Sequence, residues 1–332
     1  MDIVQHPSGE LLYSLLQSSA KPRERFTIAR TQLIDGPVMQ ECNEALARFR
    51  NSPPAEVMTA VLRDGYDFLY SQQMFGLFSP ARSVNASTWA VEQLRAAGAF
   101  EQAHTALAQA ATLVEQALLP QLTQILIVPA DPSNRNVMIR NSGLSVVGGA
   151  PGFLAVAIWP SAGNLARLGP AVVRAFALGV HWHAINASSH YTLADALAAE
   201  GRAATVVAKL FPAEPLPWLV AHTPPASWSD DLAAVAQLYG VASYSAVPAN
   251  LYGASDVQVE PPPAGVVLTH DERDYCIGVI NGAITTTDPR TIAAHLYGDQ
   301  IVGAQGHPQA GLPPYAGFEI AFRSYKTASS GW

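Results

Sequence analysis

The residues best suited to chemistry lie close together in the segment GVHWHAINASSH. It contains His181, His183 and His190, and Asp195 and Glu200 follow it. Neutral imidazole and carboxylate ligands together suit zinc, iron, copper or nickel. The two nearest histidines are two residues apart, about 200° around a regular helix, so both can face one ion only if the helix ends there. His183 and Glu200 would converge if two helices formed a hairpin. The spacing alone is equally typical of ordinary polar residues at a helix end.

Two predicted helices must position these side chains. Apolar residues recur at helical spacing over 164–185, and the same pattern over 191–211 predicts a second helix with Thr192 as its N-cap. Short apolar runs before them predict buried strands at 124–128, 137–139, 144–147 and 153–158. The histidines therefore lie on a helix pair that follows a small sheet.

The rest of the chain is predicted to be mainly helical. The clearest helix covers 100–119 and ends at Pro120. Other helices are predicted at 11–16, 38–49, 57–70, 88–97, 231–239, 291–297 and 315–325. The charge run 271–274 (DERD) predicts a solvated turn before a strand. Cys276 is predicted to lie in the core. We expect an α+β chain, mainly helical, with residues 1–120 as a helical N-terminal region and 121–332 as a second domain with a proline-rich C-terminal part.

Composition excludes several classes of protein. Of the 332 residues, 49% are hydrophobic and 14% are charged, against about 25% charged in an average soluble domain, which argues against disorder. The net charge of −7 gives no reason to bind nucleic acid. No run of about 20 apolar residues could cross a membrane, and no secretory signal is visible. Cys42 and Cys276 are too few and too far apart for a disulfide scaffold. We expect a cytoplasmic protein.

Several segments together resemble a known protein family. These segments are GGAPGFLAVAIWPSAGNLARL (148–168), TLADALAAEGRAA (192–204), LPWLV (216–220), YGDQ (297–300) and GLPPYAGFEIAFRSY (311–325). In order and spacing they are similar to a family of predicted zinc-dependent proteases, known mainly as a domain of unknown function. The resemblance covers roughly residues 120 to 330. It implies a zincin-like helix pair packed on a small sheet, and a catalytic zinc ion.

The departures from that family are informative. Where the family carries H-E-x-H-H, this chain has GVHWH, so Gly179 stands at the first zinc-ligand position and Val180 at the general base. By the same alignment, Trp182 replaces a histidine, His183 matches the last histidine, and Glu200 matches the downstream glutamate ligand. A general base contributes about 10²- to 10⁴-fold to a rate. Loss of both a ligand and the base predicts a non-proteolytic protein.

Two interpretations of this altered metal-binding site follow from the resemblance. In the first, the former protease cleft binds a small molecule or peptide, and Trp159, Trp182, His181 and His183 line it. Gly179 and Val180 would then form part of its apolar wall. The C-terminal helix start approaches the cleft in the family, so Tyr315 or His307 would contact the ligand.

In the second interpretation, the cleft catalyses a different reaction, such as a lyase, isomerase or cyclase step on a specialised metabolite. Either His181 or His183 would be the acid or base. Alternatively, His183 and Glu200, with His181 or His190, would hold a divalent metal such as zinc or iron. A metal-dependent peptidase that uses a rearranged His/Glu site is the remaining alternative.

Overall fold

A four-stranded mixed sheet forms the centre of the fold. The computed structural model describes residues 1–29, 84–132, 143–147, 152–184, 192–213, 270–298, 310–313, 316–317 and 320–321. The strands of the sheet are β1 (Asp2–Gln5), β2 (Leu122–Pro129), β3 (Leu144–Val147) and β4 (Phe153–Ile158), in the order β1-β2-β4-β3. Strands β1, β2 and β4 are parallel, and β3 is antiparallel to β4.

The two inner strands have apolar sequences because the sheet is covered. Ile125 of β2 pairs with Leu154 of β4, and both side chains are buried. Val156 and Ile158 of β4 are likewise fully enclosed. A parallel sheet with both faces covered requires such near-continuous apolar strands.

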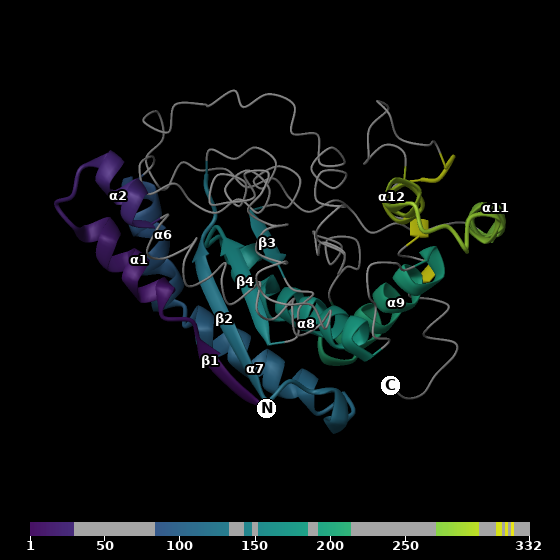
Figure 1. The fold of residues 1–332 in the computed structure, drawn as a ribbon, viewed down its shortest axis with the longest axis horizontal. Helices are drawn as coiled ribbons and strands as arrows, with labels where there is room; N and C mark the ends of the chain where they lie inside the picture. Colours follow the sequence, from purple (N-terminus) through teal and green to yellow (C-terminus); the bar gives the residue numbers. More distant parts are fainter. Residues whose placement is uncertain are drawn as a thin grey trace, which may run out of the picture.

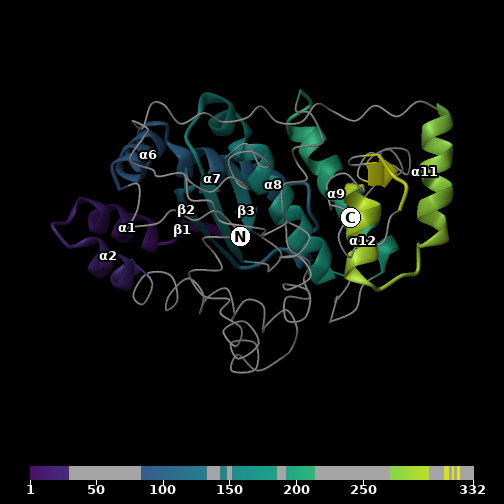
Figure 2. The same cartoon turned by 90° about the horizontal axis from the view of Figure 1, so that it is seen from above.

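Helices pack against the sheet and extend the fold at its two ends. They are α1 (Ser8–Gln17), α2 (Pro22–Ile28), α6 (Val84–Ala96), α7 (Ala99–Ala111), α8 (Ala162–Ala184), α9 (Leu193–Leu210), α11 (His270–Gly282) and α12 (Pro289–Tyr297), with a short 3-10 turn at Gln116–Leu118. Helices α1, α2 and α6 gather at one end of the molecule, and α9, α11 and α12 at the other (Figures 1 and 2). The sheet, α7 and α8 lie between them.

Helix α8 is positioned by close packing against α7. Leu107 of α7 and Leu168 and Val172 of α8 have no exposed surface and belong to one hydrophobic core. A Cβ atom on Gly169 would lie 3.4 Å from the Cβ of Ala106 and 3.1 Å from the Phe211 ring. The absence of a side chain at this glycine therefore lets the two helices approach closely.

Helix α9 is fixed at its first turn. The Thr192 hydroxyl accepts a hydrogen bond from the Asp195 backbone N–H, and the Asp195 carboxylate accepts one from the Thr192 N–H, which makes a capping box. This confirms the predicted N-cap. The backbone N–H of Leu193 also donates to the Thr286 carbonyl, so the segment before α12 supports the start of α9.

The structure confirms the α+β, mainly helical fold and most of the predicted elements that it describes. The helix predicted over 100–119 ends at Ala111, where the backbone N–H groups of Thr112 and Leu113 bond to carbonyls three residues back instead of four. The turn predicted at 271–274 is wrong, since these residues open α11, where acidic side chains favour a helix N-terminus. Cys276 is buried, as predicted.

Some predictions lie outside the described residues, namely the helices at 38–49, 57–70 and 231–239 and the strand at 137–139. The division at residue 120 stays a prediction. No helix in the described part of the chain has the length and apolar character needed to span a membrane.

Candidate functional site

An ion pair between α8 and α9 lies at the centre of the predicted site. The Arg174 Nη2 atom is 2.7 Å from both carboxylate oxygens of Glu200, and the two side chains are only 4% and 13% exposed. Burial raises the pKa of the Glu200 carboxyl above its usual value, while the charge and hydrogen bond of Arg174 act in the opposite direction. The carboxylate that the resemblance assigns to zinc is thus held by a guanidinium group.

A second polar contact joins the same two helices. His181 is 2% exposed, and its Nδ1 atom lies 3.2 Å from Nη1 of Arg202. Burial, and then the charge of Arg202, lower the pKa of His181 to about 4, although Asp195 acts to raise it. The imidazole is therefore neutral at pH 7. Because a guanidinium can only donate, Nδ1 accepts the hydrogen bond and the ring proton lies on Nε2.

The side of α8 that carries Arg174 and His181 differs from the side that carries the family's metal-ligand positions, 179 and 183. Arg174 and His181 are seven residues apart, so they lie on nearly the same side of α8. Position 179 is rotated from Arg174 by about 140°, and position 183 by about 180°. In a regular helix, Arg174 thus lies on the side of α8 away from positions 179 and 183. The predicted pairing of His183 with Glu200 stays a prediction.

Trp159 lies far from the histidine segment. It follows β4 and is 2% exposed, with its ring centroid 5.5 Å from that of Trp89 on α6. The Asn164 side chain donates to the Trp159 carbonyl and fixes the turn into α8. From residue 162 to His181 the helix axis advances by about 28 Å. Trp159 and His181 therefore lie near opposite ends of α8, and the structure does not bring them into one small pocket.

The remaining predicted residues are only partly described. Gly179 and Val180 are buried in α8, and Val180 has no exposed surface. Trp182 and His183 belong to α8 by their backbone, but their side chains lie outside the described part of the structure, as do the whole of His190 and Tyr315. The roles predicted for these residues stay predictions.

The described residues do not fit a zinc centre. Among them, no three histidine, cysteine, aspartate or glutamate side chains lie close enough together to hold a metal ion. Structural and catalytic zinc sites use three or four such ligands. Glu200, the carboxylate of the predicted set, binds Arg174 instead.

Sequence reasoning missed Arg174 and Arg202. A signal for Arg174 was present, because it is the one charged residue in the apolar segment GPAVVRAFALGV. A charged side chain is almost never fully buried unless it is paired, so this position requires a partner on a neighbouring element. The sequence gives no comparable signal for Arg202, whose contact with His181 depends on the angle between the helices.

Comparison with known proteins finds a family that the helix pair resembles. Residues 102–263, which include α8 and α9, match the family described as predicted Zn-dependent protease (DUF2268). Uncharacterized protein YjfC from Bacillus subtilis (strain 168) is 23% identical over 269 residues, which cover 80% of this chain and 73% of that protein. No solved structure matches the chain. Over residues 102–263, the chain is therefore similar to the predicted zinc-dependent protease family.

Proposed function

We propose that this chain is a non-proteolytic member of its family that binds a small organic ligand at the helix pair α8 and α9. The main support for this proposal is the contact of Arg174 with both carboxylate oxygens of Glu200. A carboxylate that makes two short contacts with a buried guanidinium would have to give them up in order to bind a metal. That loss is costly, because it leaves Arg174 charged and buried without its partner.

The residue types at the catalytic positions support the same proposal. The general-base position of the family is occupied by Val180, which is fully buried. The first ligand position is Gly179, which has no side chain. A zincin needs a carboxylate to take the proton from zinc-bound water, and valine offers neither a charge nor a hydrogen-bonding atom.

Polar groups next to the ion pair are suited to ligand recognition. His181 offers a neutral imidazole whose tautomer is set by Arg202, and Arg202 itself is half-buried. Few, well-oriented polar groups on an apolar surface are typical of small-molecule sites. An acidic group on the ligand would suit the guanidinium.

Three measurements on the full chain test the proposal. Metal analysis of untagged protein, purified with zinc in the medium, is expected to give less than about 0.1 equivalent of any transition metal. Casein and peptide libraries are expected to remain uncut. In a thermal-shift screen of small organic acids, a compound that binds is expected to raise the free energy of unfolding, by about 2.7 kcal/mol at 100 times its Kd.

Matched variants locate the binding site. Arg202→Gln is expected to abolish the thermal shift of a bound acid, and Lys209→Gln, an exposed cation on the same helix, to leave it unchanged. One equivalent of zinc, with chelator-sensitive cleavage that Glu200→Ala abolishes, would overturn the proposal. That result would instead support a metal-dependent peptidase with a rearranged His/Glu site.

A further inference from the structure

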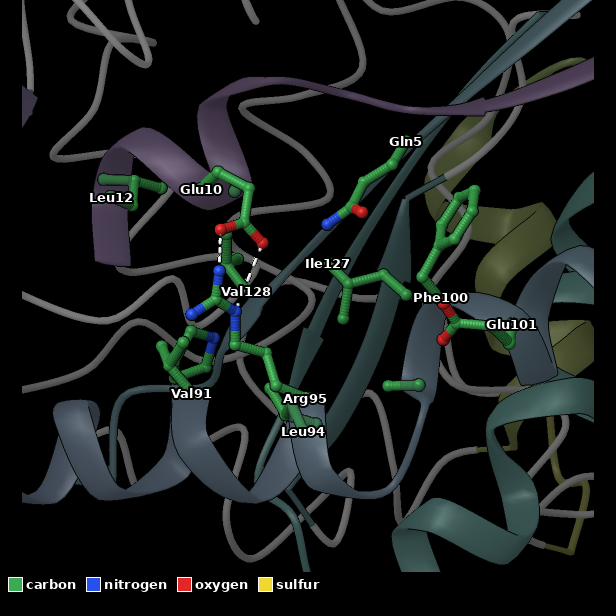
Figure 3. A pocket seen from close by; sticks show the side chains of 13 residues that line it. Gln5, Glu10, Leu12, Val91, Leu94, Arg95, Phe100, Glu101, Ile127 and Val128 are labelled. Carbon is green, nitrogen blue, oxygen red and sulfur yellow. Dashed lines mark hydrogen bonds and ion pairs between the residues drawn. The ribbon is translucent and has the colours of Figure 1, made fainter. Parts of the chain in front are cut away.

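A pocket at the other end of the molecule has no part in the proposed function. It occupies about 240 Å³ between α1, α6 and α7, at the carboxyl ends of β1 and β2 (Figure 3). Ligands of open parallel sheets bind outside the carboxyl ends of the strands. No described residue that lines the pocket belongs to α8 or α9, and all of those on α1, α6 and α7 precede residue 102, where the family match begins.

The main chain contributes polar groups to this pocket. Strand β1 ends at Gln5, opposite Ile125, whereas β2 continues to Pro129. The Ile125 carbonyl accepts a hydrogen bond from the His6 N–H on the β1 side. Alternate residues of a strand direct their backbone groups to the same side, so the N–H and C=O of Ile127 face the space beyond β1.

Gly9 leaves that backbone accessible. A Cβ atom at Gly9 would lie 3.6 Å from the Ile127 carbonyl oxygen and 3.5 Å from the Gln5 side-chain nitrogen. A larger residue at this position would therefore fill the space in front of both groups. The Ile127 carbonyl can accept a hydrogen bond from a ligand, and the Gln5 amide can donate one.

Charged side chains surround the opening. Arg95 makes two hydrogen bonds with Glu10, one of them from Nε at 3.2 Å, and its guanidinium lies 4.2 Å from the centre of the Tyr13 ring. Both members of the ion pair are about half exposed, at 47% and 51%. An ion pair this exposed is weak, so a ligand can share the guanidinium at little cost. Glu101, from the first turn of α7, adds a second carboxylate.

The floor of the pocket is apolar. Leu12, Val91 and Leu94 are buried there, and Phe100 also lines the pocket. The volume is below the roughly 300 to 1,000 Å³ of sites for drug-sized ligands. The pocket therefore suits a small molecule with one apolar group.

We propose that this pocket binds a free α-amino acid with an aliphatic side chain. Arg95 would receive the ligand's carboxylate, and the Ile127 carbonyl with Glu10 would receive its ammonium group, while Glu101 lines the opposite side of the pocket (Figure 3). The aliphatic side chain would cover the floor formed by Leu12, Val91 and Leu94. One guanidinium and two carboxylates around an apolar floor match a zwitterion better than a simple anion. The inference does not rest on the function proposed for α8 and α9.

Calorimetric titration of the full chain tests the ligand class. The probes are L-leucine, isocaproate, which lacks the ammonium group, and isoamylamine, which lacks the carboxylate. L-leucine is expected to bind at least about tenfold more tightly than either, because each loses a charge-assisted hydrogen bond. No heat with about 10 mM L-leucine, or equal binding of all three probes, would overturn the proposal.

Variants test the location. Arg95→Gln is expected to weaken L-leucine binding about tenfold or more, and Gly9→Met, which fills the pocket, to abolish it. Arg23→Gln, an exposed arginine on α2 outside the pocket, serves as the matched control and is expected to bind like the wild type. If both pocket variants bind L-leucine as tightly as the wild type, the site lies elsewhere and the assignment is wrong.

Discussion

Arg174 and Glu200 replace a predicted metal ligand with a buried ion pair, and its energetics can be measured. Removal of one member of such a pair costs about 3 to 5 kcal/mol, because the other charge stays buried and unpaired. We expect Arg174→Met to lower the free energy of unfolding in urea by about 3 kcal/mol. The double variant Arg174→Met with Glu200→Leu should recover most of that loss, since an apolar pair of similar volume is often as stable.

The exposed pair Glu10–Arg95 is the control for this measurement. Its side chains are about half in solvent, so Arg95→Met should cost less than about 1 kcal/mol. If Arg174→Met cost no more than Arg95→Met, the contact between α8 and α9 would not have the structural role that we assign to it.

His181 gives the fold a dependence on pH in the acid range. Its pKa is about 4 in the folded chain, against 6.5 for an ordinary histidine. Well above pH 6.5, His181 carries no proton in either state. As the pH falls from 6.5 to 4, the unfolded chain takes up a proton at His181 and the folded chain does not, so the free energy of unfolding decreases. The decrease approaches roughly 3 kcal/mol.

The variant His181→Gln isolates this effect, because the other titrating groups are the same in both proteins. As the pH falls from 6.5 to 4, the free energy of unfolding should decrease more for the wild type than for the variant. Denaturant unfolding at a series of pH values measures it. Parallel pH profiles of the two proteins would contradict the buried, neutral state of His181.

At the scale of elements, the capping box determines where α9 begins. Thr192 and Asp195 satisfy each other's backbone N–H groups, and loss of such a cap costs about 1 kcal/mol. We expect Thr192→Ala to lower the free energy of unfolding by that amount. Thr192→Ser keeps the hydroxyl and should cost less than half as much. Thermal and urea unfolding distinguish the two, and equal losses would mean that the methyl group of threonine, not the cap, stabilises this turn.

The start of α9 could be predicted from the sequence because a cap depends on residues three positions apart. Strands β2 and β4 could be predicted for a related reason, since their continuous apolar runs reflect burial on both faces. Strand β1 could not. It has only four residues, three of them exposed, and it exists because β2 supplies its hydrogen-bond partners more than a hundred positions later.

The same distinction applies to the candidate site. The alignment with the family identified Glu200, but its partner Arg174 is 26 positions earlier on another helix. Which residues of α8 face α9 depends on how the two helices are rotated, and this rotation comes from packing against α7 and the sheet. Residue types alone therefore predicted a possible set of metal ligands. They could not predict that Glu200 forms an ion pair with a guanidinium group.

For the whole molecule, one hydrophobic core crosses the predicted boundary at residue 120. Ala103, Leu107 and Ala110 of α7 have no exposed surface and belong to the same core as Leu168 and Val172 of α8. Strand β1 also comes from the N-terminal region, yet it pairs with β2. Each part therefore covers apolar surface of the other.

This shared core predicts that residues 121–332 do not fold by themselves. Without α7, the apolar face of α8 would be exposed to water, at a cost of about 25 cal/mol for each Å². We expect the isolated fragment to lack a cooperative thermal transition and near-ultraviolet circular dichroism, both of which the intact chain should show. A fragment of residues 98–332 restores α7 and is the matched comparison, and it should unfold cooperatively at a lower temperature than the intact chain. If residues 121–332 unfolded at the temperature of the intact chain, the core would be divisible at residue 120, and α7 would be dispensable for holding α8 in place.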